Sequence, residues 1–163
     1  MAISFASVSF TPSPRSASWC FLLLEYLDEF ATLAWYLVAD GKLVEDTFAR
    51  TMAKLDMTAF ESSIPALAYI QARDVLITEA IAVLADARRE DDENGPFQPY
   101  SIVTLPDRPR LAFMLRLIIR SSEAEVAKFL DISPFEVQGL VKHAIDRLSI
   151  APLISTPTGF YDA

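Results

Sequence analysis

The sequence predicts an all-α protein, and three observations support this fold class. Hydrophobic residues make up 52% of the 163 residues, which is enough to bury a core in a chain of this length. Only four residues are glycine, which favours ordered helices over a glycine-punctuated β fold. Apolar residues also recur at helical spacings along most of the chain. We therefore expect two small helical lobes.

The N-terminal region predicts a leader followed by an apolar helix. Residues 1–18 are rich in Ser and Pro and show no helical period, so we expect a flexible leader. Over residues 19–39 apolar side chains occupy nearly the whole helical circumference, so this helix must be buried by the fold or by a partner. Glu25, Asp28 and Glu29 interrupt it. Because such charges are costly in a bilayer, we expect no membrane span.

Two further helices are expected to complete a first lobe over residues 19–89. Asp40 and Gly41 predict a left-handed stop of the first helix. A second helix is then expected over residues 44–55. A third helix should begin at Pro65, after the cap signal of Ser63, and end near residue 87.

The best linker candidate lies over residues 90–104. Its acidic run, Glu90 to Glu93, is followed by Asn94, Gly95 and Pro96, and the helical period stops. We expect it to join the first lobe to a second lobe over residues 105–150, followed by a tail over residues 151–163.

The second lobe opens with a helix of clear apolar period. Asp107 predicts the cap of a helix that begins near Pro109. The spacing of its apolar residues places four of them in the core: Leu111, Met114, Leu115 and Ile118.

Two capping boxes follow this helix. Ser122 with Glu125 predicts the start of a short helix, and Ser133 with Glu136 predicts the start of a longer one with proline in its first position. A tight turn at residues 130–132 separates them. A short helix, a brief turn and a longer helix together predict a helix-turn-helix.

At these residues the chain resembles region 4 of the extracytoplasmic-function sigma factors of bacterial RNA polymerase. The matching residues are Leu105, Pro106, Arg108, Phe113, Leu115, Arg116, Glu125, Val126, Ala127, Leu130, Ile132, Ser133, Val137, Ala144, Arg147 and Leu148. In the first lobe, Ala39-Asp40 and Glu45-Asp46 stand where region 2 of the same family has its Gly-Asp and Glu-Asp pairs.

The resemblance implies partners and contact residues. In this family region 2 binds the polymerase clamp and melts the −10 element, while region 4 reads −35 DNA from its second helix. It implies contacts to RNA polymerase core or to an anti-sigma-like protein through four residues: Glu45, Asp46, Ala49 and Arg50. If DNA is bound, it places five residues nearest to it: Arg108, Arg110, Gln138, Lys142 and Arg147.

The charge of the chain departs from that of a DNA-binding family member. The net charge is −8, which repels phosphates. Residues 20–95 carry six Lys and Arg against fifteen Asp and Glu, whereas residues 105–148 carry seven against six. The second helix of the motif has only Lys142 and Arg147 as cations, and Glu136 stands near its start. We therefore expect promoter recognition to be weakened.

One interpretation joins these features: the chain is a sigma-factor-like transcription regulator that mimics the shape of a sigma factor and acts through protein–protein contacts. A working sigma factor that directs RNA polymerase to promoters is the first alternative. The second is a helical module that dimerises through its apolar first helix. The third is a small-molecule pocket lined by aromatic residues, namely Phe21, Tyr26, Phe30, Trp35 and Tyr36.

Residues that could carry catalysis or bind a metal are sparse. Cys20 and His143 are the only residues of their kinds and have no partner pattern, so we expect Cys20 to be a buried hydrophobe and His143 a surface residue. We predict no enzyme, no catalytic residue, no cofactor and no metal site. The lone cysteine and the absence of a secretory signal pattern predict a cytoplasmic location.

Overall fold

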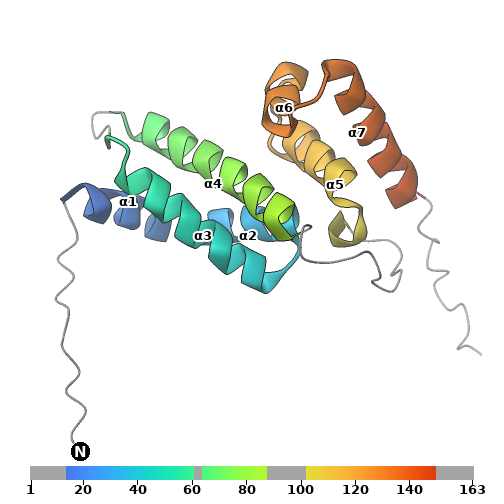
Figure 1. Ribbon diagram of the computed structural model, residues 1–163. Coiled ribbons are helices and arrows are strands. Elements are labelled where there is room, and N and C mark those ends of the chain that lie inside the picture. Colours follow the sequence, from blue (N-terminus) through green and yellow to red (C-terminus); the bar gives the residue numbers. More distant parts are fainter. Residues whose placement is uncertain (1–13, 61–63, 88–101, 150–163) are drawn as a thin grey trace, which may run out of the picture.

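The computed structural model describes residues 14–60, 64–87 and 102–149, and in these ranges the chain is all-α without a strand (Figure 1). The predicted fold class is therefore confirmed for this part of the chain. The elements are α1 (Pro14–Glu25), α2 (Leu27–Val38), α3 (Gly41–Asp56), α4 (Pro65–Ala87), the 3₁₀ helix η1 (Ile102–Thr104), α5 (Asp107–Phe113), the π-helical η2 (Met114–Ile118), α6 (Glu123–Leu130) and α7 (Pro134–Ser149).

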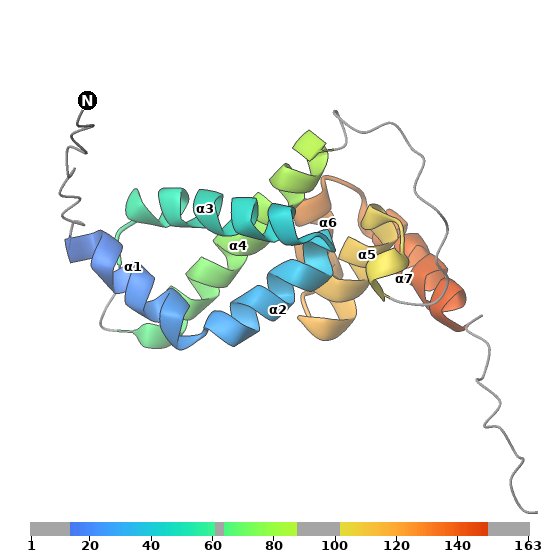
Figure 2. The same ribbon diagram turned by 90° about the horizontal axis from the view of Figure 1, so that it is seen from below.

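The expected first helix is divided into two helices. α1 begins at Pro14, inside the expected leader, because proline needs no hydrogen-bond partner for its nitrogen in the first helical turn. The rest of the expected leader lies outside the described residues. Tyr26 separates α1 from α2 with φ −109° and ψ 26°. The division lets α1 contact chiefly α3 while α2 contacts chiefly α4 (Figure 2).

The predicted left-handed stop at Asp40 and Gly41 is wrong by one residue. Ala39 ends α2 with φ 57°, and its backbone N–H donates to the carbonyl of Trp35 at 2.7 Å. Asp40 instead begins α3, because its carboxylate accepts a hydrogen bond from the N–H of Leu43 at 3.0 Å. α3 consequently starts at Gly41, three residues earlier than expected.

A first hydrophobic core lies among α1, α2, α3 and α4. The indole of Trp19 is fully buried there and donates to the carbonyl of Thr58 at 3.1 Å. Thr47 and Thr51 are also buried, and each hydroxyl donates to a carbonyl one helical turn earlier at 2.7 Å. The buried apolar members are Trp19, Leu22, Leu23, Phe30, Ala34, Leu55, Ala68, Ala72 and Leu76.

A second core joins the two parts of the chain. We call α1 to α4 the N-terminal part, η1 to α7 the C-terminal part, and this cluster the shared core. The N-terminal part contributes Leu37, Val38, Ile77, Ala80 and Leu84, and the C-terminal part contributes Leu111, Met114, Leu115, Val126, Ala127 and Val137. The parts therefore pack against each other. Of the expected linker, residues 102–104 form η1 beside α2, and the rest lies outside the described residues.

The entrance to the C-terminal part differs from the prediction in two details. Pro106, rather than Asp107, is the N-cap of α5, and the side chain of Asp107 pairs with Arg110 instead. Leu111, Met114 and Leu115 are buried as expected, but Ile118 is 57% exposed. The π-helical turn η2 explains this, because its extra residue per turn moves the following side chains around the helix axis.

Candidate functional site

The α6–α7 segment has the elements that the sequence predicts. Asp131 ends α6 with φ 51°, and the N–H groups of Asp131 and Ile132 both donate to the carbonyl of Ala127. Ser122 and Glu125 form the expected capping box at the start of α6. α7 begins at Pro134 as expected and buries Val137 and Ala144. The helix positions and their caps are confirmed; their use as a DNA-reading motif stays a prediction.

The start of α7 carries a negative charge that is held in place. The carboxylate of Glu136 accepts from the N–H of Ser133 at 2.8 Å and from its hydroxyl at 2.7 Å. These hydrogen bonds lower the pKa of Glu136, while its own N–H donates to the Ser133 oxygen at 3.3 Å. The carboxylate is therefore ionised at neutral pH, and it lies in the first turn of α7.

The exposed face of α7 is mixed rather than basic. Lys142 and Arg147 are exposed as expected, but the amide of Gln138 donates to Glu123 at 3.0 Å. Phe135 is 83% exposed one residue after the start of the helix. The face thus offers two cations and an aromatic ring beside carboxylates, which is a weaker attractor for a phosphate backbone than a cationic stripe.

Arg110 corrects the prediction that it lies near DNA. The residue is only 3% exposed, and its guanidinium donates to the carbonyl of Leu37 at 3.1 and 3.2 Å, to that of Leu105 at 2.8 Å and to Asp107 at 2.7 Å. Leu37 lies in the last turn of α2, whose carbonyls lack helical partners. Arg110 therefore caps α2 and joins the two parts of the chain. Its neighbour Arg108 is exposed and helps to lower the pKa of Glu136.

The expected partner-contacting residues share the outer face of α3. Glu45, Asp46, Ala49 and Arg50 are all exposed. The guanidinium of Arg50 pairs with Asp86 near the end of α4 at 2.7 Å, and this contact raises the pKa of Arg50. The structure thus places these four residues on one exposed face of α3, and their use as a partner contact stays a prediction.

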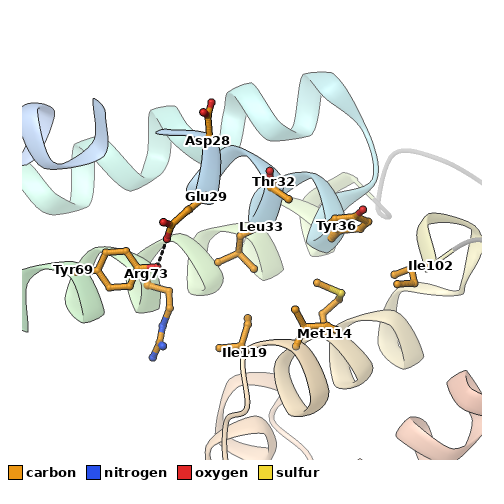
Figure 3. A pocket seen from close by; sticks show the side chains of 11 residues that line it. Asp28, Glu29, Thr32, Leu33, Tyr36, Tyr69, Arg73, Ile102, Met114 and Ile119 are labelled. Carbon is orange, nitrogen blue, oxygen red and sulfur yellow. Dashed lines mark hydrogen bonds between the residues drawn. The ribbon is translucent and has the colours of Figure 1, made fainter. Parts of the chain in front are cut away.

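A groove that the sequence analysis missed lies between the two parts (Figure 3). Its volume is about 710 Å³, and we define it by its lining residues: Asp28, Glu29, Thr32, Leu33, Tyr36, Tyr69, Arg73, Ile102, Met114, Ile118 and Ile119. These residues are distant in sequence, and only the helical packing brings them together. No local pattern in the sequence predicts that these residues line one groove. In the structure, the exposed apolar side chains of η2 mark its position.

The aromatic residues considered for a pocket separate into different environments. Phe30 is buried in the first core, and Tyr26 contacts both Phe30 and Tyr69 through ring edges. Phe21 is 72% exposed on α1, and of the five residues only Tyr36 lines the groove. Cys20, expected to be buried, is exposed.

Comparisons with protein-family models, with curated proteins and with solved structures find no match to this chain. None of the helices described here is both long and apolar enough to cross a membrane. Within residues 14–60, 64–87 and 102–149, no group of three or more His, Cys, Asp or Glu side chains could hold a metal ion.

Proposed function

We propose that this chain is a sigma-factor-like regulator that acts through protein–protein contacts rather than by reading promoter DNA. The observation that carries the proposal is the contrast within α6 and α7. Both helices keep their capping boxes, their turn and their buried residues. The outward face of α7 has Lys142 and Arg147 as its cations, with the carboxylate of Glu136 at its start.

The use of Arg110 supports the same proposal. The resemblance to region 4 places Arg110 near DNA. Here its guanidinium is buried against Leu37, Leu105 and Asp107. Moving it to a DNA surface would leave carbonyls without their donors and break a buried ion pair, at a cost of about 3 kcal/mol or more.

The packing of the two parts also favours a mimic over a working sigma factor. In the family that the sequence resembles, region 2 acts at the −10 element and region 4 at the −35 element, which are separate stretches of the promoter. Residues of both parts share one core, with Leu37 and Leu111 in the same cluster. We infer that two lobes packed on one core are less suited to two separate DNA elements than lobes that can move apart, whereas a partner that recognises the packed form requires no opening of this core.

Binding experiments with purified partners test the proposal. The immobilised chain is offered RNA polymerase core and an anti-sigma protein from the same cell, each separately. We expect a complex with the anti-sigma protein that a sigma factor competes away, and none with core polymerase. A stable complex with core that starts transcription at a promoter would contradict the proposal and favour a working sigma factor.

Charge reversal on α3 locates the contact. Glu45→Lys with Asp46→Lys changes the outer face of α3, and we expect it to weaken the anti-sigma complex about tenfold or more. Glu25→Lys with Asp146→Lys gives the same change of charge at exposed positions of α1 and α7 and serves as the matched control. Equal effects of the two pairs would argue against the α3 face.

A second candidate function is a dimeric interaction module, and the exposed apolar side chains of α1 favour it. Phe21 and Leu24 are 72% and 61% exposed, and Leu27 follows them at the start of α2. Sedimentation at several concentrations tests this candidate. A mass that stays that of the monomer removes it, and a dimer that dissociates on Phe21→Ser with Leu24→Ser supports it.

A further inference from the structure

We propose that the groove between the two parts binds a small lipophilic cation, that is, an organic cation whose charge is carried by a mostly apolar body. The inference rests on the shape and chemistry of the groove alone and is independent of the sigma-like function.

The size and lining of the groove suit a small organic ligand. Its volume of about 710 Å³ falls within the range of about 300–1,000 Å³ that is typical of ligand sites. Leu33 reaches into it from α2, and Met114 and Ile119 reach toward Leu33 from the opposite wall (Figure 3). Ile118, although apolar, is 57% exposed, so an apolar ligand would remove this side chain from water.

The wall opposite α2 is formed around the π-helical turn. η2 is followed by Ile119, whose N–H donates to the carbonyl of Met114 at 3.0 Å. Turns of this kind cost helical regularity and are frequent at functional sites. Here the turn directs Ile118 and Ile119 to the groove. The π-helical turn therefore supplies apolar side chains to the groove, whereas a regular helix would direct them into the core.

The charges around the groove favour a cation over an anion. Asp28 and Glu29 line its α2 side, and the hydroxyl of Tyr69 donates to Glu29 at 3.0 Å. Among the described residues of the lining, the one cation is Arg73, and it is already paired with Asp74 at 3.0 Å. With Asp74 included, two carboxylates therefore remain in excess over the cations.

Aromatic rings strengthen this preference. Tyr36 and Tyr69 both line the groove, from α2 and α4 respectively. The face of an aromatic ring attracts a cation by about 0.5–2 kcal/mol, and it attracts an organic cation more than an anion of the same size. Apolar walls, two tyrosine rings and excess carboxylate together define the class of ligand.

Ligand binding would also hold the two parts together. Leu33, Tyr36 and Tyr69 belong to the N-terminal part, whereas Ile102, Met114 and Ile118 belong to the C-terminal part. A ligand that contacts both walls binds only the packed arrangement, so it stabilises that arrangement by mass action.

A pair of ions with the same shape and opposite charge tests the proposal. Tetraphenylphosphonium and tetraphenylborate are offered to the full chain in titration calorimetry, and methyl NMR of the isoleucines reports the location. We expect saturable one-site binding of the phosphonium ion, at least about tenfold tighter than that of the borate. The methyl signals of Ile102, Ile118 and Ile119 should shift, and that of Ile145 on α7 should not.

Substitutions at exposed lining positions separate this site from attraction to an acidic surface. Ile118→Lys places a positive charge on the wall of the groove and should weaken phosphonium binding about tenfold or more. Ile145→Lys changes the net charge by the same amount but lies on the exposed face of α7, away from the groove. It should leave the affinity for the phosphonium ion within about twofold of that of the unchanged chain. Glu29→Gln should reduce the preference for phosphonium over borate.

Three results would overturn the proposal. They are the absence of saturable binding, equal or tighter binding of the borate, and equal effects of Ile118→Lys and Ile145→Lys. The last would assign binding to the overall charge of the chain rather than to the groove. Because both isoleucines are exposed, neither substitution is expected to prevent folding.

Discussion

Arg110 carries its charge in the interior, where its guanidinium joins α5 to the last turn of α2. A buried cation is costly unless its donors are satisfied, and here carbonyl oxygens and Asp107 satisfy them. The sequence alone could not distinguish Arg110 from Arg108, because both stand in the same basic stretch. The difference between an interior and a surface arginine comes from the contact with α2, which lies 73 positions away in sequence.

Replacing Arg110 should therefore destabilise the chain far more than replacing its neighbour. Arg110→Met removes the donors to Leu37 and the ion pair with Asp107. We expect the free energy of unfolding to fall by about 3 kcal/mol, measured by urea denaturation. Arg108→Met, at an exposed position, should change it by no more than about 0.5 kcal/mol. Similar losses in both variants would contradict the role assigned to Arg110.

Gly139 has no steric role among the residues that the structure describes. No atom outside its own helix lies within 4 Å of the place where a Cβ would be, and its φ is not positive. Because glycine in a helix interior costs about 0.5–1 kcal/mol relative to alanine, Gly139→Ala should stabilise the protein by about that amount. Gly41→Ala, at the first residue of α3, is the control and should gain less. A lower melting temperature for Gly139→Ala would contradict this account.

At the scale of helices, the sequence predicts the features that neighbouring residues determine, but it does not predict the features that packing between helices determines. The capping boxes of α6 and α7 and the start of α4 at Pro65 need only neighbouring residues, so they were predictable. The division at Tyr26, the π-helical turn and the exposure of Ile118 depend on how helices fit against one another. The groove is of the second kind, because its walls come from segments that are remote in sequence.

The capping box of α7 makes the stability of the folded state fall as the pH is lowered into the acidic range. Hydrogen bonds from Ser133 lower the folded-state pKa of Glu136 below its ordinary 4.5, so the ionised carboxylate stabilises the folded state. This contribution is fully present above about pH 4.5 and is lost as the pH falls through the lowered pKa. Glu136→Gln should thus be less stable than the parent chain at pH 6, with the difference shrinking toward pH 3, as measured by thermal denaturation. A difference that stays constant with pH would contradict the prediction.

At the scale of the whole molecule, the shared core makes the two parts one cooperative unit. Ile77 and Leu84 of α4 pack in the same cluster as Leu115 and Val137. Neither part can lose its structure without exposing apolar surface of the other. The spacing of apolar residues predicts the helices and their apolar faces, but it does not predict that these faces meet.

Unfolding should therefore occur in a single transition. Both tryptophans, Trp19 and Trp35, lie in the N-terminal part, so their fluorescence reports that part, whereas far-ultraviolet circular dichroism reports all helices. We expect the two signals to give the same midpoint in urea. In Arg110→Met the midpoints should separate, because the link to α2 is lost. Two distinct midpoints in the unchanged protein would show that the parts unfold independently.

Binding of the full chain to a −35 promoter duplex in about 50 mM salt tests the central claim most directly. A variant with Gln138→Arg, Gly139→Arg and His143→Arg, all at exposed positions of α7, restores cations to the same frame and should bind DNA in a salt-dependent manner. The unchanged chain should bind the promoter duplex and a scrambled duplex equally weakly. Tight binding of the unchanged chain to the promoter duplex, with a clear preference over the scrambled one, would contradict the account.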